Sequence, residues 1–195
     1  MIVINKKIFE TPMTIPQMVE QIVLQGLLEE TNFKIDEVKL TDDQVGWINE
    51  FVYPSGKIVH LKGKRQSGRT SMGVGMVLAA ALFKDRSVSV MMTVNDQIVK
   101  DHQSKFLNYL RTFCEVFNLP ELIKMKNRHQ IVLVNDSVIN FTTNHSCAMC
   151  GVRADNVFLD LFNIHTIEDL DDELMAAILP TIYHEGGKLI VSLGE

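Results

Sequence analysis

The sequence predicts an α/β fold in which a mainly parallel β-sheet is covered by helices on both faces. Short apolar runs typical of strands alternate with helical patterns along the chain, and a glycine-containing basic loop stands between one such strand and one such helix. Hydrophobic residues make up 46% of the 195 residues and charged residues 22%, so the chain carries enough apolar material to bury a sizeable core.

The helices are predicted from apolar residues that recur every three or four positions. Pro16 stands in the first turn of the earliest helix, where its missing N–H is no loss. The third helix contains Gly73 and Gly75, and because glycine weakens a helix, we expect close packing at both. Pro180 is expected to end the last helix. The predicted helices are residues 15–28, 42–51, 71–83, 96–117 and 170–179.

The strands are predicted from short runs rich in valine, isoleucine and other apolar residues. Asn135-Asp136 separates two of these runs by two residues, which is typical of a β-hairpin turn. The predicted strands are residues 57–63, 87–94, 129–134, 137–143, 156–160 and 188–193.

This pattern divides the chain into a helical lead-in over residues 1–39 and a core domain over residues 40–195. No apolar run reaches the length of a membrane-spanning helix, and the N-terminus lacks the order of features that marks a signal peptide. We therefore expect a cytoplasmic protein without a membrane partner.

Charge is unevenly distributed along the chain, whose net charge is −5. Ten Lys/Arg and three Asp/Glu lie between Lys57 and Arg111, whereas eight Asp/Glu and no Lys/Arg lie between Ala154 and Gly187. Overall acidity argues against a protein that coats nucleic acid indiscriminately, but the basic stretch permits contact with phosphates. Taken singly, each stretch is explained as well by solvated helix faces.

The most specific motif is GKRQSGRT, which follows a predicted strand, opens a predicted helix and matches the phosphate-binding pattern G-x-x-x-x-G-K-[ST] except at Arg69. Its backbone N–H groups and the positive end of the helix would face nucleotide phosphates, and Thr70 would offer its hydroxyl to Mg²⁺. Arginine keeps the charge of lysine but is larger and planar, so Lys64 is a second candidate for the phosphate-binding cation. The alternative is a basic turn without nucleotide. The candidate nucleotide-binding residues here are Gly63, Lys64, Arg65, Gln66, Ser67, Gly68, Arg69 and Thr70.

A nucleotide hydrolase also needs an acidic residue at the end of a neighbouring strand for Mg²⁺, and a second carboxylate that orients the attacking water. Asp160 ends the apolar run Val157–Leu159 and has the right context for the metal. Leu161 stands where the second carboxylate is expected, and leucine cannot polarise water. Acids elsewhere that are open as substitutes are Asp155, Glu168 and Asp169.

In this order, the motifs resemble the ATPase domain of the large terminase subunit of tailed bacteriophages, over roughly residues 40–192. The segment LTDDQ, ending at Gln44, resembles the element that reads adenine, and KRQSGRT resembles a variant Walker A loop. Residues 151–160 resemble the lead into the Walker B strand, and LIVS, ending at Ser192, resembles the motif that couples hydrolysis to movement. The resemblance implies that Gln44 contacts adenine, Asp160 completes the metal site, Arg153 senses the γ-phosphate and Ser192 couples nucleotide state to motion.

The resemblance implies a P-loop NTPase of the RecA-like (ASCE) type with a β-hairpin insertion, which binds ATP and Mg²⁺. The expected function is ATP hydrolysis that powers translocation of double-stranded DNA, gripped through its backbone without sequence reading, with the stretch Lys57–Arg111 as the expected DNA surface. Expected partners are a portal, a small terminase subunit and further copies of the chain in a ring. Terminases continue into a nuclease domain that this sequence lacks, so we expect no DNA cleavage.

Two departures from the terminase pattern support an alternative reading. Arg69 and Leu161 replace the usual lysine and catalytic acid, which favours a non-hydrolysing terminase-like protein that binds nucleotide and has a structural or regulatory role. A helicase-like ATPase is a third possibility, against which the lack of a second RecA-like domain counts.

Overall fold

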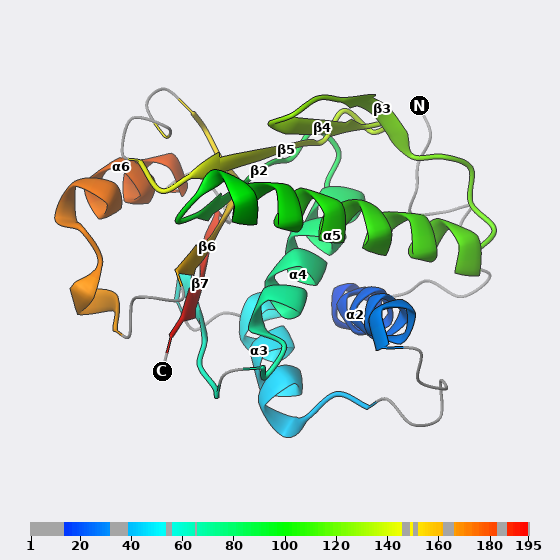
Figure 1. Ribbon diagram of the computed structural model, residues 1–195, viewed down its shortest axis with the longest axis horizontal. Coiled ribbons are helices and arrows are strands. Elements are labelled where there is room, and N and C mark those ends of the chain that lie inside the picture. The colour runs from blue at the N-terminus through cyan, green and yellow to red at the C-terminus, as the bar shows by residue number, and fades with distance from the viewer. Residues whose placement is uncertain are drawn as a thin grey trace.

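The computed structural model describes residues 14–31, 39–53, 56–64, 66–145, 149, 152–161, 166–182 and 187–194. A seven-stranded sheet with the order β1-β7-β6-β2-β5-β4-β3 forms its centre (Figure 1). The first five strands in this order are parallel to their neighbours, and β4 and β3 continue the sheet in antiparallel orientation. The mainly parallel sheet is therefore as predicted, and the hairpin β4-β5 extends one edge of it. The strands are β1 (Ile58–Leu61), β2 (Val88–Thr93), β3 (Ile123–Lys126), β4 (Gln130–Leu133), β5 (Val138–Thr143), β6 (Asn156–Leu161) and β7 (Lys188–Leu193).

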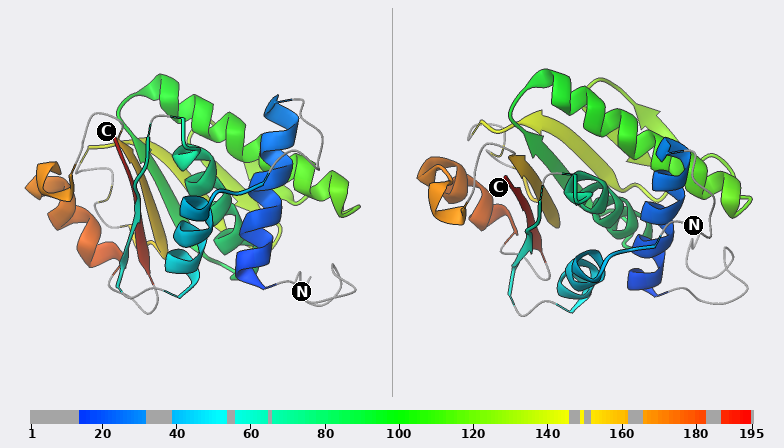
Figure 2. Two further views of the ribbon diagram at one scale, coloured as in Figure 1. Left: turned by 90° about the horizontal axis from the view of Figure 1, so that it is seen from below. Right: turned by 60° about the horizontal axis from the view of Figure 1, so that its bottom comes forward.

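Helices cover both faces of this sheet, as predicted (Figure 2). On one face, α4 packs against β2, β6 and β7, and α5 packs against β2 and β5, while α3 lies beside β1. Helix α2 packs on α4 and α5 rather than on the sheet. On the other face, α6 packs against β6 and β7. The helices are α2 (Ile15–Thr31), α3 (Asp42–Val52), α4 (Arg69–Phe83), α5 (Asp96–Val116) and α6 (Asp172–Ile182), and η3 (Ile167–Asp169) is a short 3-10 helix.

Two hydrophobic clusters lie on the two faces of the sheet, and β6 contributes to both. Phe158 belongs to the cluster beneath α4, whereas Val157, Leu159 and Leu161 belong to the cluster beneath α6. All six residues of β6 are buried, as expected for a central parallel strand covered on both faces.

The two glycines of α4 allow the close packing that the sequence predicted. A Cβ atom at Gly73 would lie 2.2 Å from Cζ of Phe158, and one at Gly75 would lie 2.4 Å from Cγ2 of Val23 in α2. Helix α4 can therefore approach both β6 and α2 only because these positions lack a side chain.

Two sequence predictions about secondary structure were wrong. Pro180 does not end α6, which continues to Ile182, because Pro180 falls in the last turns and the buried Ile178 and Ile182 hold the helix on the sheet. Strand β3 was not predicted, since IKMK has only two apolar residues and is short. Its position at the sheet edge explains its lysines, which discourage pairing with a further strand.

Candidate functional site

The carboxyl ends of the parallel strands bring a row of polar residues together. In the sheet register, Leu61 of β1 stands opposite Ser192, Ser192 opposite Asp160, and Asp160 opposite Thr93. The three polar residues in this row are buried. Ligands of open α/β sheets bind at this edge of the sheet, and the loop that leaves β1 for α4 lies at the same edge.

The backbone of that loop is shaped for close approach to a ligand. Gln66 and Gly68 have φ angles of 68° and 82°, in the left-handed region that favours glycine. Gly68 directly precedes α4 and has no side chain to cap it, so the first N–H groups of the helix stay available to an anion. The hydroxyl of Ser67, between the two, is buried without a hydrogen-bond partner in the described part of the chain.

The structure brings Thr70 and Asp160 into direct contact. Oγ1 of Thr70 donates a hydrogen bond to Oδ2 of Asp160 at 2.6 Å, and Nε2 of His102 lies 3.0 Å from the same oxygen. Thr93 donates from Oγ1 to the backbone oxygen of Asp160 at 3.1 Å. Burial alone would raise the pKa of Asp160, but the hydrogen bond and charge of His102, and hydrogen bonds from Thr70 and Ser192, outweigh it and hold that pKa below its usual value. Asp160 is therefore a buried carboxylate prepared to carry negative charge.

His102 is a component of this site that our sequence analysis did not assign. Its side chain is 2% exposed, its ring stacks on Phe158 with centroids 6.0 Å apart, and its Nδ1 atom has no hydrogen-bond partner among the described residues. The sequence does contain a signal, because His102 occupies the apolar face of α5 between the buried Val99 and Phe106. A titratable residue at such a position marks a polar site within the core.

A cavity of about 530 Å³ opens beside the loop and these side chains. It adds two charged residues of α5 to the site, Asp101 and Lys105, which our sequence analysis did not single out. Nζ of Lys105 lies 3.4 Å from Oγ of Ser71, in the first turn of α4. The cavity is lined by Gln66, Ser67, Gly68, Arg69, Thr70, Ser71, Thr93, Ile98, Asp101, His102, Lys105, Asp160 and Ser192.

Gln44, the residue assigned to adenine, is engaged at both ends of its side-chain amide. Nε2 donates to the backbone oxygen of Ser67 at 2.9 Å, and Oε1 accepts from the backbone N–H of Thr41 at 2.9 Å. The side chain is buried and belongs to the capping box at the start of α3. In this arrangement Gln44 joins α3 to the phosphate-loop candidate.

The basic residues of the loop differ in their surroundings. Nη1 of Arg69 donates to the backbone oxygen of Leu193 at the end of β7, while the side chain of Lys64 is exposed. Arg65 lies outside the described residues. Gly63 packs beneath the loop, because a Cβ atom there would lie 2.9 Å from Oγ of Ser67.

Arg153 is not brought to the loop. It is exposed and precedes β6, so it lies at the amino end of that strand, and β6 alone spans about 20 Å. A role for Arg153 at the γ-phosphate of this same site therefore receives no support from its position.

The missing second carboxylate is not restored by the acids that the sequence left open. Leu161 is fully buried in the cluster beneath α6. Asp155 lies at the amino end of β6 and accepts from Nζ of Lys84 at 2.6 Å and from the N–H of Val88 at 2.8 Å. Glu168 and Asp169 are exposed on η3. None of these acids lines the cavity.

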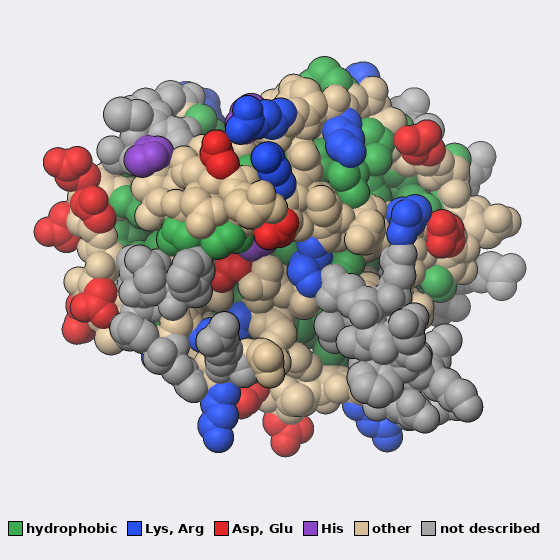
Figure 3. Space-filling model, in the orientation of Figure 1, with side chains coloured by type: hydrophobic (Ala, Val, Ile, Leu, Met, Phe, Trp, Pro, Cys, Tyr) green, Lys and Arg blue, Asp and Glu red, His purple; other side chains and the backbone are tan. Residues whose placement is uncertain are grey.

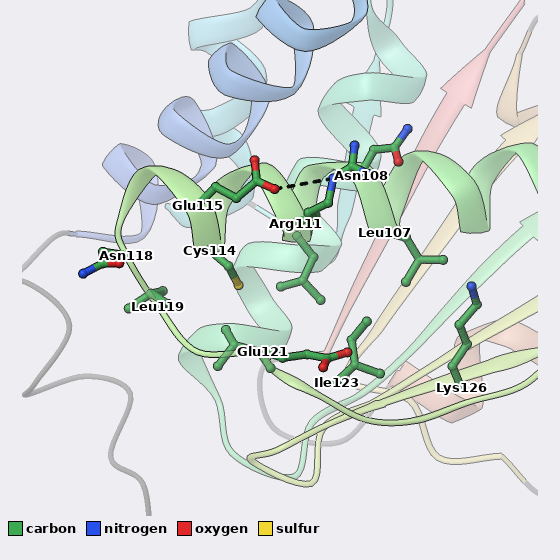
Figure 4. Close-up of a pocket in the computed structure, with 12 residues that line it drawn as sticks. Leu107, Asn108, Arg111, Cys114, Glu115, Asn118, Leu119, Glu121, Ile123 and Lys126 are labelled. Carbon is green, nitrogen blue, oxygen red and sulfur yellow. Dashed lines mark ion pairs between the residues drawn. The ribbon is translucent and has the colours of Figure 1, made fainter.

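A second cavity, of about 790 Å³, lies between the carboxyl half of α5 and β3 (Figure 4). Its wall is mostly apolar, and an ion pair joins Nε of Arg111 to Oε1 of Glu115 at 3.9 Å on its rim. Burial raises the pKa of the Cys114 thiol in this wall to about 11. The cavity offers neither a phosphate-binding loop nor a buried carboxylate, so the chemistry points to the smaller cavity.

Charged side chains are spread over the surface in a way that the linear sequence does not convey (Figure 3). Acidic side chains gather over η3 and α6, where Glu168, Asp169, Asp171, Asp172 and Glu173 are exposed. The basic stretch expected to contact DNA forms no continuous patch on the face shown, and two of its members pair with acids: Lys84 with Asp155 and Arg111 with Glu115. Among the helices described, none combines the length and apolar character needed to cross a bilayer.

Comparisons with known proteins locate the fold. No protein-family model and no curated protein sequence matches the chain. The large terminase of bacteriophage HK97 has a similar structure, with a TM-score of 0.65 and 14% identity over 93% of this chain and 38% of that one. The ATPase domain of the Thermus phage P74-26 large terminase gives 0.60 and 17% over 86% and 68%. The large terminase of a further thermophilic bacteriophage, in complex with ADP, gives 0.57 and 10% over 80% and 39%.

At these identities the similarity establishes the fold. The chain has the fold of the ATPase domain of phage large terminases, and the predicted resemblance is confirmed at that level. The chain spans about two fifths of the length of the HK97 protein.

Proposed function

We propose that the chain is the ATP-binding and ATP-hydrolysing domain of a terminase-like motor that translocates double-stranded DNA. The fold supports the terminase-like part of this proposal. The contact between Thr70 and Asp160 supports the nucleotide part, because it joins the loop and the strand end that a P-loop enzyme needs at its metal.

The residues present fit a magnesium nucleotide. Phosphates would be held by the N–H groups of the loop and of the first turn of α4, by the hydroxyl of Ser67 and by the exposed ammonium of Lys64. Oγ1 of Thr70 and the carboxylate of Asp160 are the hard oxygen ligands that Mg²⁺ prefers. When bound, Mg²⁺ would neutralise charge on the phosphates. The ADP complex of the large terminase with the same fold supports nucleotide as the ligand.

Ser192 is placed to sense the state of this site. It ends β7 one residue before its last position and hydrogen-bonds to Asp160, while Arg69 holds the neighbouring Leu193. A change at Asp160 would therefore be passed to the end of β7, which supports the coupling role that the terminase resemblance implies.

The partners are proposed from the terminase resemblance. They are double-stranded DNA contacted through its backbone, a portal, a small terminase subunit and other copies of the chain in a ring, in the cytoplasm of a host cell. ATP turnover that rises when double-stranded DNA is added would support the DNA part of the proposal, and turnover that is indifferent to DNA would contradict it.

The test of hydrolysis compares Mg²⁺-dependent ATP turnover of the wild-type chain with that of Asp160→Asn. Asp136→Asn is the matched control, because Asp136 is exposed and its φ of 62° is one that asparagine also adopts. We expect turnover to fall at least about a hundredfold in Asp160→Asn and to be unchanged in the control. Equal turnover in the two variants would contradict the proposal.

A non-hydrolysing terminase-like protein is the second candidate, and two observations favour it. Leu161 is buried where the family's catalytic acid is expected, and the guanidinium of Arg69 is bound to the backbone of β7 instead of facing the loop. This candidate predicts that wild-type protein binds Mg²⁺-ATP and releases no ADP.

A further inference from the structure

We infer that Asp101 of α5 is the catalytic residue that orients the attacking water and takes its proton, in place of the acid missing at position 161. The inference rests on the proposed function, since it assigns one step of that ATP hydrolysis to a residue of this chain.

The cavity beside the phosphate-loop candidate contains two carboxylates, those of Asp101 and Asp160. Asp160 is already held by Thr70 and His102 through one oxygen, and by Ser192. That arrangement suits a metal ligand, whose oxygens must stay fixed and charged. The second role, that of orienting water, falls to the other carboxylate in the cavity.

The helical spacing of α5 explains why Asp101 faces the cavity. Ile98, Asp101, His102 and Lys105 are three, four and seven positions apart, which places them on one face of a helix. All four line the cavity. His102 fixes the orientation of this face, because its Nε2 atom lies 3.0 Å from Oδ2 of Asp160. Lys105 fixes it at the next turn, because its Nζ atom lies 3.4 Å from Oγ of Ser71.

The surroundings of Asp101 suit a group that works on water. Its side chain is exposed at the cavity, and Nε2 of Gln97 donates to its Oδ1 atom at 3.1 Å. This hydrogen bond orients the carboxylate and leaves Oδ2 to accept from a water molecule. Lys105 lies one turn further on and places a positive charge beside the same space.

The proposed step conserves atoms and charge. The oxygen of a water molecule forms a bond to the γ-phosphorus of ATP, and the bond from that phosphorus to the bridging oxygen breaks. The electron pair of the broken bond leaves with ADP. One proton of the water passes to the carboxylate of Asp101 and from there to solvent, so the products are ADP, inorganic phosphate and a proton.

The test uses Asp101→Asn, with Asp96→Asn as the matched control on the same helix. Asp96 is exposed, pairs with Arg128 at 3.2 Å and does not line the cavity. Three quantities are measured for each protein: the Kd of a non-hydrolysable Mg²⁺-ATP analogue, the rate of ADP formation, and the nucleotide recovered from the protein after one binding event. The first and third report on the site independently of turnover.

We expect Asp101→Asn to bind the analogue at least as tightly as wild type, because the substitution removes a negative charge near the phosphates. Turnover should fall about 10²- to 10⁴-fold, as for loss of a general base, and the recovered nucleotide should be ATP. Asp96→Asn should behave as wild type.

Turnover of Asp101→Asn close to that of wild type would overturn the inference while leaving the proposed ATPase intact. A loss of turnover matched by an equal loss of analogue binding would also overturn it, since Asp101 would then act on binding alone. Wild-type protein that binds the analogue without forming ADP would refute hydrolysis, and Asp101 with it. Absence of binding by wild type would refute the proposed function itself.

Discussion

Thr70 and Asp160 lie 90 positions apart in the chain, yet the hydroxyl of one donates to the carboxylate of the other at 2.6 Å. The contact joins the first turn of α4 to the end of β6, so it exists only if α4 packs across the parallel strands in the observed register. It is therefore both a product of the fold and the centre of the proposed metal site.

Gly73 determines how closely α4 can approach β6. We expect Gly73→Ala to lower the free energy of unfolding by about 1–3 kcal/mol, because its Cβ would lie 2.2 Å from the buried ring of Phe158. Gly46→Ala in α3 is the control, since no atom lies within 4 Å of a Cβ there, and it should stabilise by roughly 0.4–1 kcal/mol. Urea unfolding measures both, and equal effects of the two substitutions would refute the packing argument.

Gln44 is predicted to hold the loop instead of selecting the base. Gln44→Ala breaks the hydrogen bond to the backbone oxygen of Ser67, so it should weaken binding of Mg²⁺-ATP and Mg²⁺-GTP by a similar factor. Equilibrium titrations with both nucleotides check this. A loss confined to ATP would instead support the adenine contact that the terminase resemblance implies.

Arg69 and Lys64 are predicted to have separate roles. Arg69→Ala should lower the free energy of unfolding by about 1–3 kcal/mol, because it removes a charged donor from the backbone oxygen of Leu193. Lys64→Ala should leave stability unchanged and weaken ATP binding roughly tenfold, since the exposed ammonium is the one proposed to reach phosphate. The reverse pattern in unfolding and binding measurements would make Arg69 the phosphate ligand.

Cys114 is predicted to react slowly in the native protein. Burial disfavours the thiolate and raises the pKa of the thiol to about 11, so only about one part in a thousand is thiolate at pH 8. In a Cys147→Ser, Cys150→Ser background, alkylation should be slow at pH 8, accelerate roughly tenfold for each pH unit up to about pH 10, and become fast in denaturant. Fast labelling of native protein at pH 8 would show that the wall of the cavity in Figure 4 opens readily.

Much of the fold could be predicted because its central elements have local signals. Strand β7 was predicted as residues 188–193 and has those bounds, since a continuous apolar run is what a doubly covered parallel strand requires. The edge strand β3 lacked this signal, because a strand at the edge of a sheet does not need apolar residues on both faces. Helix α6 continued past Pro180 because packing outweighed the local preference.

The site could be predicted only where its residues belong to a contiguous motif. The loop and Asp160 were found in this way, and the structure brings Thr70 and Asp160 together. Asp101 and Lys105 were not found, because only the orientation of α5 across the sheet places them at the cavity. The location of Arg153 was accessible to reasoning, since a residue that precedes a parallel strand lies at the opposite edge from the loop.

The measurement that tests the central claim most directly is the Kd of ATP with and without Mg²⁺ for wild type and Thr70→Val, which removes one hydroxyl at nearly constant shape. For wild type we predict tighter binding with Mg²⁺ than with a chelator. In Thr70→Val most of that difference should disappear, a loss of roughly ten- to a hundredfold in the presence of Mg²⁺. An identical Mg²⁺ dependence in the two proteins would contradict a nucleotide–metal site between Thr70 and Asp160.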